Sequence, residues 1–124
     1  MTIEELYQNI GGSYENAIRV LRMDKLIDKH IRKFIANGVV ENLLQAGETM
    51  DPTELFETSH AMKGVCGNLG LTNLYVAASE ISEEFRPGNE RHFTDDEVKE
   101  KLQAISELYQ KTADGIRAYE EANQ

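Results

Sequence analysis

Proline, cysteine and tryptophan are almost missing from this chain of 124 residues, and each scarcity narrows what it can be. The only prolines are Pro52 and Pro87, which leaves long stretches free for uninterrupted helix. The single cysteine, Cys66, excludes an internal disulfide and a cysteine-rich metal or iron–sulfur site, and fits a reducing compartment. No apolar run approaches the length of a membrane span, and the N-terminus lacks the features of a signal peptide. We therefore expect a cytoplasmic protein.

Positive charge is also scarce, since 13 basic against 22 acidic side chains give a net charge of −9. This balance argues against attraction to nucleic acid or to an anionic membrane. One segment runs the other way and predicts a local positive face, either a solvated helix surface or a docking surface. Its basic residues are Arg19, Arg22, Lys25, Lys29, Arg32 and Lys33.

The apolar residues recur at the helical period, and strand-like alternation is absent. Residues 1–124 are expected to form one domain with a core at about 12–118 and a short N-terminal helix within 1–11. The spacing of Thr2 and Glu5 predicts a capping box at the start of that short helix. A second short helix is predicted for about 14–23. Capping signals then predict four long helices joined by short connections. The first runs from a cap at Asp24 to about Gly47 and is broken or kinked at Gly38, and the second runs from Asp51-Pro52 to about Leu69. The third runs from a cap at Thr72 to about Phe85, and the fourth begins at Thr94 and runs towards the C-terminus. The expected fold is all-α, an antiparallel up-and-down four-helix bundle with one or two short N-terminal helices.

The helix after Pro52 has two distinct faces. Its predicted inward row consists of Leu55, Ser59, Met62, Cys66 and Leu69. A different face carries His60 and the residues three, four and seven positions after it, namely Lys63, Gly64 and Gly67. Glycine inside a helix costs roughly 1 kcal/mol relative to alanine, so two of them suggest a close approach to the backbone. A nucleophilic imidazole, a nearby cation and a cleared flank predict a phosphoryl site. Alternatively, the histidine is merely exposed and the glycines admit a neighbouring helix.

The segment from Ser59 to Leu71, SHAMKGVCGNLGL, closely resembles the phosphorylation motif of histidine phosphotransfer (HPt) domains of two-component phosphorelays. The resemblance rests on a histidine followed by lysine at three, glycine at four and glycine at ten residues. It extends over about residues 12–118, with further matches at Tyr14-Glu15-Asn16-Ala17, Phe34, Leu74, Ala78 and Ile81. The family implies the same four-helix bundle.

The resemblance implies a role for each matching residue. His60 would accept the phosphoryl group, Lys63 would assist it, and Gly64 would clear space for the partner's active site. A partner-binding surface would include Gly67, Ser82 and Arg86, joined by Lys29 and Lys33 of the positive face. Ser82 stands where many members carry a longer polar side chain, often glutamine, that steadies the histidine ring.

The expected function is a phosphocarrier that takes a phosphoryl group from a receiver phospho-aspartate and passes it to another receiver aspartate. It would be no enzyme, because the chain has no nucleotide-binding motif for making phosphohistidine from ATP. Receiver domains or a hybrid histidine kinase would be its partners, it would be a monomer, and it would need no cofactor, with Mg²⁺ bound only by the receiver.

Two alternatives remain from sequence. The chain can be a docking module of the same fold that has lost phosphotransfer. It can also be a metal-binding bundle, which needs paired Glu-x-x-His spacings. Glu57 with His60 gives one such spacing, whereas His30 and His92 lack it, so no metal ligand is predicted.

Overall fold

The computed structural model describes residues 1–124 and contains helices but no strand. Its helices, in chain order, are α1 (Ile3–Ile10), α2 (Tyr14–Leu21), α3 (Asp24–Phe34), the 3-10 turn η1 (Ile35–Asn37), α4 (Val39–Thr49), α5 (Pro52–Asn68), α6 (Thr72–Glu84) and α7 (Asp95–Ala122). The all-α prediction is confirmed.

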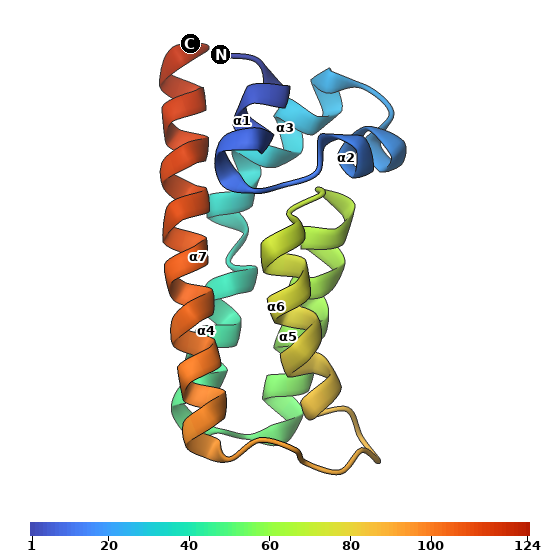
Figure 1. Ribbon diagram of the computed structural model, residues 1–124, viewed down its shortest axis with the longest axis vertical. Helices are drawn as coiled ribbons and strands as arrows, with labels where there is room; N and C mark the ends of the chain where they lie inside the picture. The colour runs from blue at the N-terminus through green and yellow to red at the C-terminus, as the bar shows by residue number, and fades with distance from the viewer.

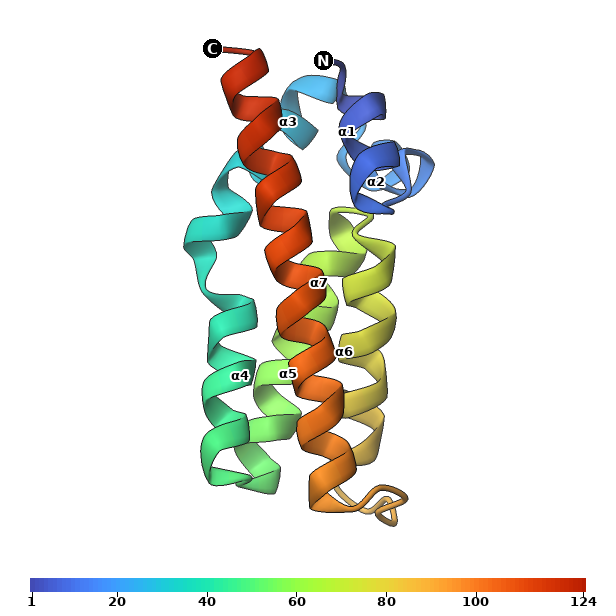
Figure 2. The same cartoon turned by 60° about the vertical axis from the view of Figure 1, so that its left-hand side comes forward.

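Helices α4 to α7 form an antiparallel up-and-down bundle, and α1 to α3 gather at one end of it (Figure 1). The connections within the bundle are short, which makes consecutive helices neighbours. Helix α7 is the longest element, with 28 residues, and at 1.5 Å per residue it spans about 42 Å. It therefore runs past the bundle and also packs against α1 and α3, so both chain termini lie at the same end (Figure 2).

The predicted break at Gly38 is present. Gly38 adopts a left-handed conformation with φ of 78°, after the single 3-10 turn of η1. Asn37 Oδ1 accepts a hydrogen bond at 3.1 Å from the amide of Val39, the first residue of α4. The expected long helix is thus two helices, of which α3 belongs to the end cap and α4 to the bundle.

The capping signals located most helix starts. Thr2 with Glu5 and Thr94 with Glu97 both form complete capping boxes, and Asp51 caps α5 ahead of Pro52. Two predicted caps are wrong by one residue. Met23 occupies the cap position of α3 and Leu71 that of α6, so Asp24 and Thr72 are the first helical residues instead.

Two further differences from the predicted helices concern the end of α4 and the role of Asp24. Helix α4 continues past Gly47 to Thr49, and Met50 then ends it with a left-handed φ of 59°. Asp24 uses its carboxylate to accept a hydrogen bond from the Tyr14 hydroxyl, which links α2 to α3 rather than capping α3. The connection from α2 to α3 thus includes a contact between side chains of two helices, which the local spacing of residues does not predict.

One hydrophobic core unites the bundle and its end cap. Every member of the predicted inward row of α5 is buried: Leu55, Ser59, Met62, Cys66 and Leu69. The Tyr7 hydroxyl of α1 donates a hydrogen bond to the Leu69 carbonyl at 2.5 Å, across the end of α5. This bond occupies one of the carbonyls that a helix leaves free at its C-terminus. No helix of the protein is both long and apolar enough to cross a membrane.

Candidate functional site

His60 lies on the exposed face of α5, one turn after Phe56. The two rings are stacked, with centroids 5.6 Å apart and planes inclined by 21°. Phe56 is itself half-buried, so it supports one side of the imidazole while the other side faces solvent. The α5 backbone and this aromatic contact therefore hold the ring at the surface, where a second protein can reach it.

A shallow hollow adjoins His60. Its lining residues are His60, Lys63, Gly64, Gly67, Asn68 and Tyr75. The hollow contains no carboxylate, although the chain as a whole is acidic. Lys63 is half-buried and forms no ion pair. An imidazole beside an unpaired ammonium group suits the arrival of an anion such as a phosphoryl group.

The two glycines of this face differ in their surroundings. A β-carbon built at Gly64 would meet no atom within 4 Å, so the surface there is open. A β-carbon at Gly67 would lie 3.2 Å from two ring carbons of Tyr75, so this glycine seats the Tyr75 ring against α5. Open backbone beside His60 is therefore supplied by Gly64, whereas Gly67 admits the neighbouring helix α6, the alternative the sequence left open.

An apolar patch borders the hollow through Gly67 and Tyr75. Three of the five exposed large hydrophobic residues of the protein line it, namely Val20 at 47% exposed, Tyr75 at 38% and Val76 at 60%. Arg19 of α2 is the only charged residue among the lining side chains. Exposed apolar groups gathered beside a reactive side chain are typical of a protein-binding surface.

The positive segment divides between two sides of the molecule. Arg19 lines the apolar patch, and Lys33 and His30 line another hollow beside Asn68. Arg32, by contrast, pairs with Asp28 at 3.0 Å and lies over the Tyr119 ring of α7. Lys29 is exposed on α3. Only part of the predicted positive face therefore borders the His60 surface.

Ser82 does not lie where the prediction placed it. It is 1% exposed, within the buried stripe of α6, and its hydroxyl has no hydrogen-bond partner. A residue so buried contacts no docking partner, so its assignment to the partner-binding surface is wrong. Arg86 is exposed but forms an ion pair with Glu83 at 3.0 Å, one turn before it on the chain.

The remaining reactive groups are not arranged as a second site. Burial raises the pKa of the Cys66 thiol to about 12, so it stays protonated and packs in the core. His30 and His92 lie on α3 and on the loop after α6, and no cluster of three or more histidine, cysteine or acidic side chains has the arrangement to hold a metal ion.

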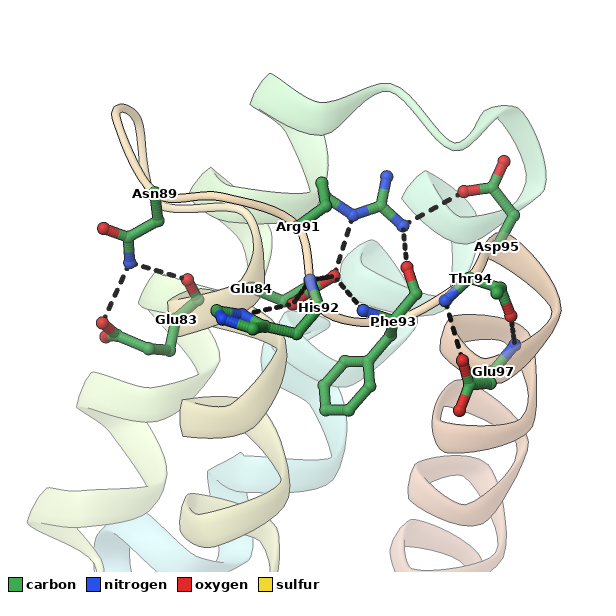
Figure 3. Close-up of polar contacts among 9 residues, drawn as sticks. All are labelled: Glu83, Glu84, Asn89, Arg91, His92, Phe93, Thr94, Asp95 and Glu97. Carbon is green, nitrogen blue, oxygen red and sulfur yellow. Dashed lines mark hydrogen bonds and ion pairs between the residues drawn. The ribbon is translucent and has the colours of Figure 1, made fainter.

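The loop between α6 and α7 contains a polar cluster that the sequence did not indicate (Figure 3). The carboxylate of Glu84, whose side chain is 1% exposed, accepts hydrogen bonds from Arg91 Nε at 2.9 Å and from the amides of His92 at 3.0 Å and Phe93 at 2.8 Å. Burial alone would raise the pKa of Glu84, but these donors outweigh it and lower the pKa below its usual value. Glu84 therefore remains ionised and fixes the loop.

These observations define the class: a helical bundle that presents an exposed histidine beside an unpaired lysine and an open stretch of helix backbone. The model of the family described as "Hpt domain" matches residues 35–111, which is more than half of the chain. The chain therefore belongs to the Hpt domain family, whose members carry phosphoryl groups on histidine in phosphorelays and work with receiver domains and kinases. The match is narrower than the expected 12–118 and leaves α1 to α3 outside it. No curated protein and no solved structure matched the chain.

Proposed function

We propose that this protein is a phosphorelay carrier and that His60 is its phosphoacceptor. The observation that carries the proposal is the shared face of α5, on which the exposed imidazole adjoins the unpaired Lys63 and the open backbone at Gly64. The motif resemblance and the family match support the same assignment. His60 is also the only histidine of the chain in such a hollow, because His30 and His92 line hollows without a neighbouring glycine face.

In the proposed reaction, a ring nitrogen of neutral His60 uses its lone pair to attack the phosphorus of a receiver phospho-aspartate. The N–P bond forms, the bond between phosphorus and the aspartate oxygen breaks, and the aspartate leaves as a carboxylate. Lys63 offsets the negative charge that arrives on the imidazole. Transfer onward is the reverse reaction on a second receiver. The receiver supplies the Mg²⁺, so this chain needs no cofactor.

The proposed docking surface is the His60 hollow with the apolar patch beside it. Gly64 lets the receiver approach the α5 backbone, while Val20 and Val76 offer apolar area and Arg19 and Lys33 offer positive charge for an acidic receiver pocket. We expect Gly64→Gln to block docking sterically, since its side chain projects into the open space. Wild-type transfer rates in that variant would contradict the clearance argument.

Charge on this surface is tested by reversing Lys29 and Lys33 together. If they attract the receiver, the double variant transfers more slowly and its rate depends less on salt. Reversal of Lys99 and Lys111 changes the net charge equally on exposed positions of α7, away from the hollow, and serves as the control. If the two double variants had the same transfer rate and the same salt dependence, the positive segment would be a solvated helix face with no role in docking.

The decisive experiment measures phosphate on the protein after incubation with a panel of phosphorylated receiver domains. Intact mass and acid lability are compared among wild type, His60→Gln and His30→Gln, the last removing an exposed histidine elsewhere. Acid-labile, alkali-stable phosphate that only His60→Gln abolishes is the expected result. A folded protein that takes phosphate from no receiver would instead favour the docking module that has lost phosphotransfer.

A further inference from the structure

Lys63 lies between two hollows of opposite electrostatic character. On one side is the His60 hollow, which has no carboxylate. On the other side is a hollow that Lys63 shares with three acidic residues, Glu80, Glu83 and Glu84. If the Lys63 ammonium paired with one of these carboxylates, the attraction would draw it towards that hollow and away from His60.

Each of those carboxylates already has another partner. Glu80 pairs with Lys101 of α7 at 2.8 Å, and Glu83 pairs with Arg86 at 3.0 Å and accepts a hydrogen bond from the Asn89 amide at 3.0 Å. Glu84 is occupied by the loop that follows α6. Lys63 itself forms no ion pair, although three acidic residues line the same hollow.

Lys101 is held in place by contacts other than its ion pair with Glu80. The Lys101 ammonium lies 4.3 Å from the centre of the Phe93 ring, and only 31% of the Lys101 side chain is exposed. Phe93 in turn donates its backbone amide to Glu84 and its carbonyl accepts from Arg91 (Figure 3). The loop thus fixes the aromatic ring against which Lys101 rests, so this cation is less free than an ordinary surface lysine.

We propose that Lys101 is a positioning residue for phosphotransfer: by occupying Glu80, it keeps the Lys63 ammonium free to meet the phosphoryl group on His60. Arg86 has the same effect on Glu83, which gives this residue an indirect role in place of the partner contact expected from sequence. The inference rests on the proposed function, because it concerns how readily Lys63 serves the same phosphoacceptor.

The test compares rates of His60 phosphorylation with phosphoramidate, a small donor that requires no docking surface. Lys101→Met removes the charge but keeps an apolar stem against Phe93, and it leaves Glu80 free to pair with Lys63. We expect phosphorylation to slow about two- to fivefold, the range that an exposed ion pair supports. Lys99→Met, which removes an unpaired exposed charge on the same helix, is the matched control and should react like wild type.

A second substitution separates this role from a structural one. If freed Glu80 captures Lys63, Glu80→Gln in the Lys101→Met background restores the wild-type rate, whereas damage to the fold would not be repaired by it. Lys101→Arg keeps the charge and should also react like wild type, and circular dichroism checks the fold of every variant. If Lys101→Met does not fold, Lys101→Gln replaces it in the same series.

The possible outcomes distinguish the two proposals. Wild type and Lys99→Met reacting equally, with a slower Lys101→Met that Glu80→Gln rescues, supports the positioning role. Equal rates in Lys101→Met and Lys99→Met, or a slow Lys101→Met that Glu80→Gln does not rescue, overturns the positioning role while leaving the phosphocarrier intact. No phosphate on wild-type His60 from phosphoramidate or from any receiver overturns both.

Discussion

Replacing Gly64 with alanine should make the protein more stable and a poorer phosphocarrier. Gly64 lies inside α5, and a β-carbon there meets nothing within 4 Å. Since alanine is about 0.8–1 kcal/mol more favourable than glycine within a helix, and no clash opposes it, the free energy of unfolding should rise by about 1 kcal/mol. For a domain of this size, that corresponds to a rise in Tm of roughly 3–6 °C.

Gly47 provides the contrasting case on α4. A β-carbon there would lie 2.4 Å from Cδ1 of buried Leu102, so the Leu102 side chain must move to admit it. Overpacking costs about 1–3 kcal/mol, which offsets or exceeds the gain in helix propensity, and Gly47→Ala should be no more stable than wild type. Gly47→Ala should accept phosphate from a phosphorylated receiver at the wild-type rate, because Gly47 lies outside the His60 hollow.

Thermal and urea unfolding followed by circular dichroism measure the stability changes, and transfer from a phosphorylated receiver measures function. The expected pattern is a stabilised Gly64→Ala with slower transfer, because even a methyl group would enter the open space into which we propose the receiver docks. A destabilised Gly64→Ala would mean that this glycine serves packing within the bundle. A stabilised variant with wild-type transfer would show that α5 needs no clearance at this position.

Three further predictions follow from buried groups. Ser82→Ala should be about 1 kcal/mol more stable than wild type by urea unfolding and should transfer normally, since it removes a buried hydroxyl without a partner. Glu84→Gln should lose about 1–3 kcal/mol at neutral pH. Because the pKa of Glu84 is lowered in the folded protein, its stabilisation is present above the usual carboxyl pKa and is lost as pH falls through the lower folded value. The two proteins should therefore converge in stability as the pH is brought below the usual carboxyl pKa. Cys66 should resist alkylation at pH 8 until the protein is unfolded by denaturant, because burial raises its pKa to about 12.

The features that the sequence predicted well are those that depend on neighbours within one or two helical turns. Capping boxes at Thr2 and Thr94 involve a residue three positions away, and the break at Gly38 requires only a residue that tolerates a positive φ. The α5 motif is of the same kind, because steps of three and four place its members on one face.

Ser82 shows that a positional match to other family members does not fix which way a helical residue faces. Ser82 lies one turn after Ala78 and next to Ile81, both buried, so it belongs to the inward stripe of α6. The inward stripe of α6 can be predicted from the sequence, and it is better evidence for the position of Ser82 than a match to other family members. Tyr75 lies on the outward side of α6 and was not predicted as a site residue.

The ionic partners of the acidic residues near Lys63 come instead from residues further along the chain, and no local sequence pattern predicts them. Glu84 acquires its donors from a loop seven to nine residues away, and Glu80 acquires Lys101 from a different helix. Under the proposed function, a short motif specifies the phosphoacceptor, whereas the packing of α6, its loop and α7 decides the ionic partners of the residues around Lys63. Two chains with the same α5 motif but different residues at these positions should then differ in how fast they accept a phosphoryl group, even from a donor too small to recognise either surface.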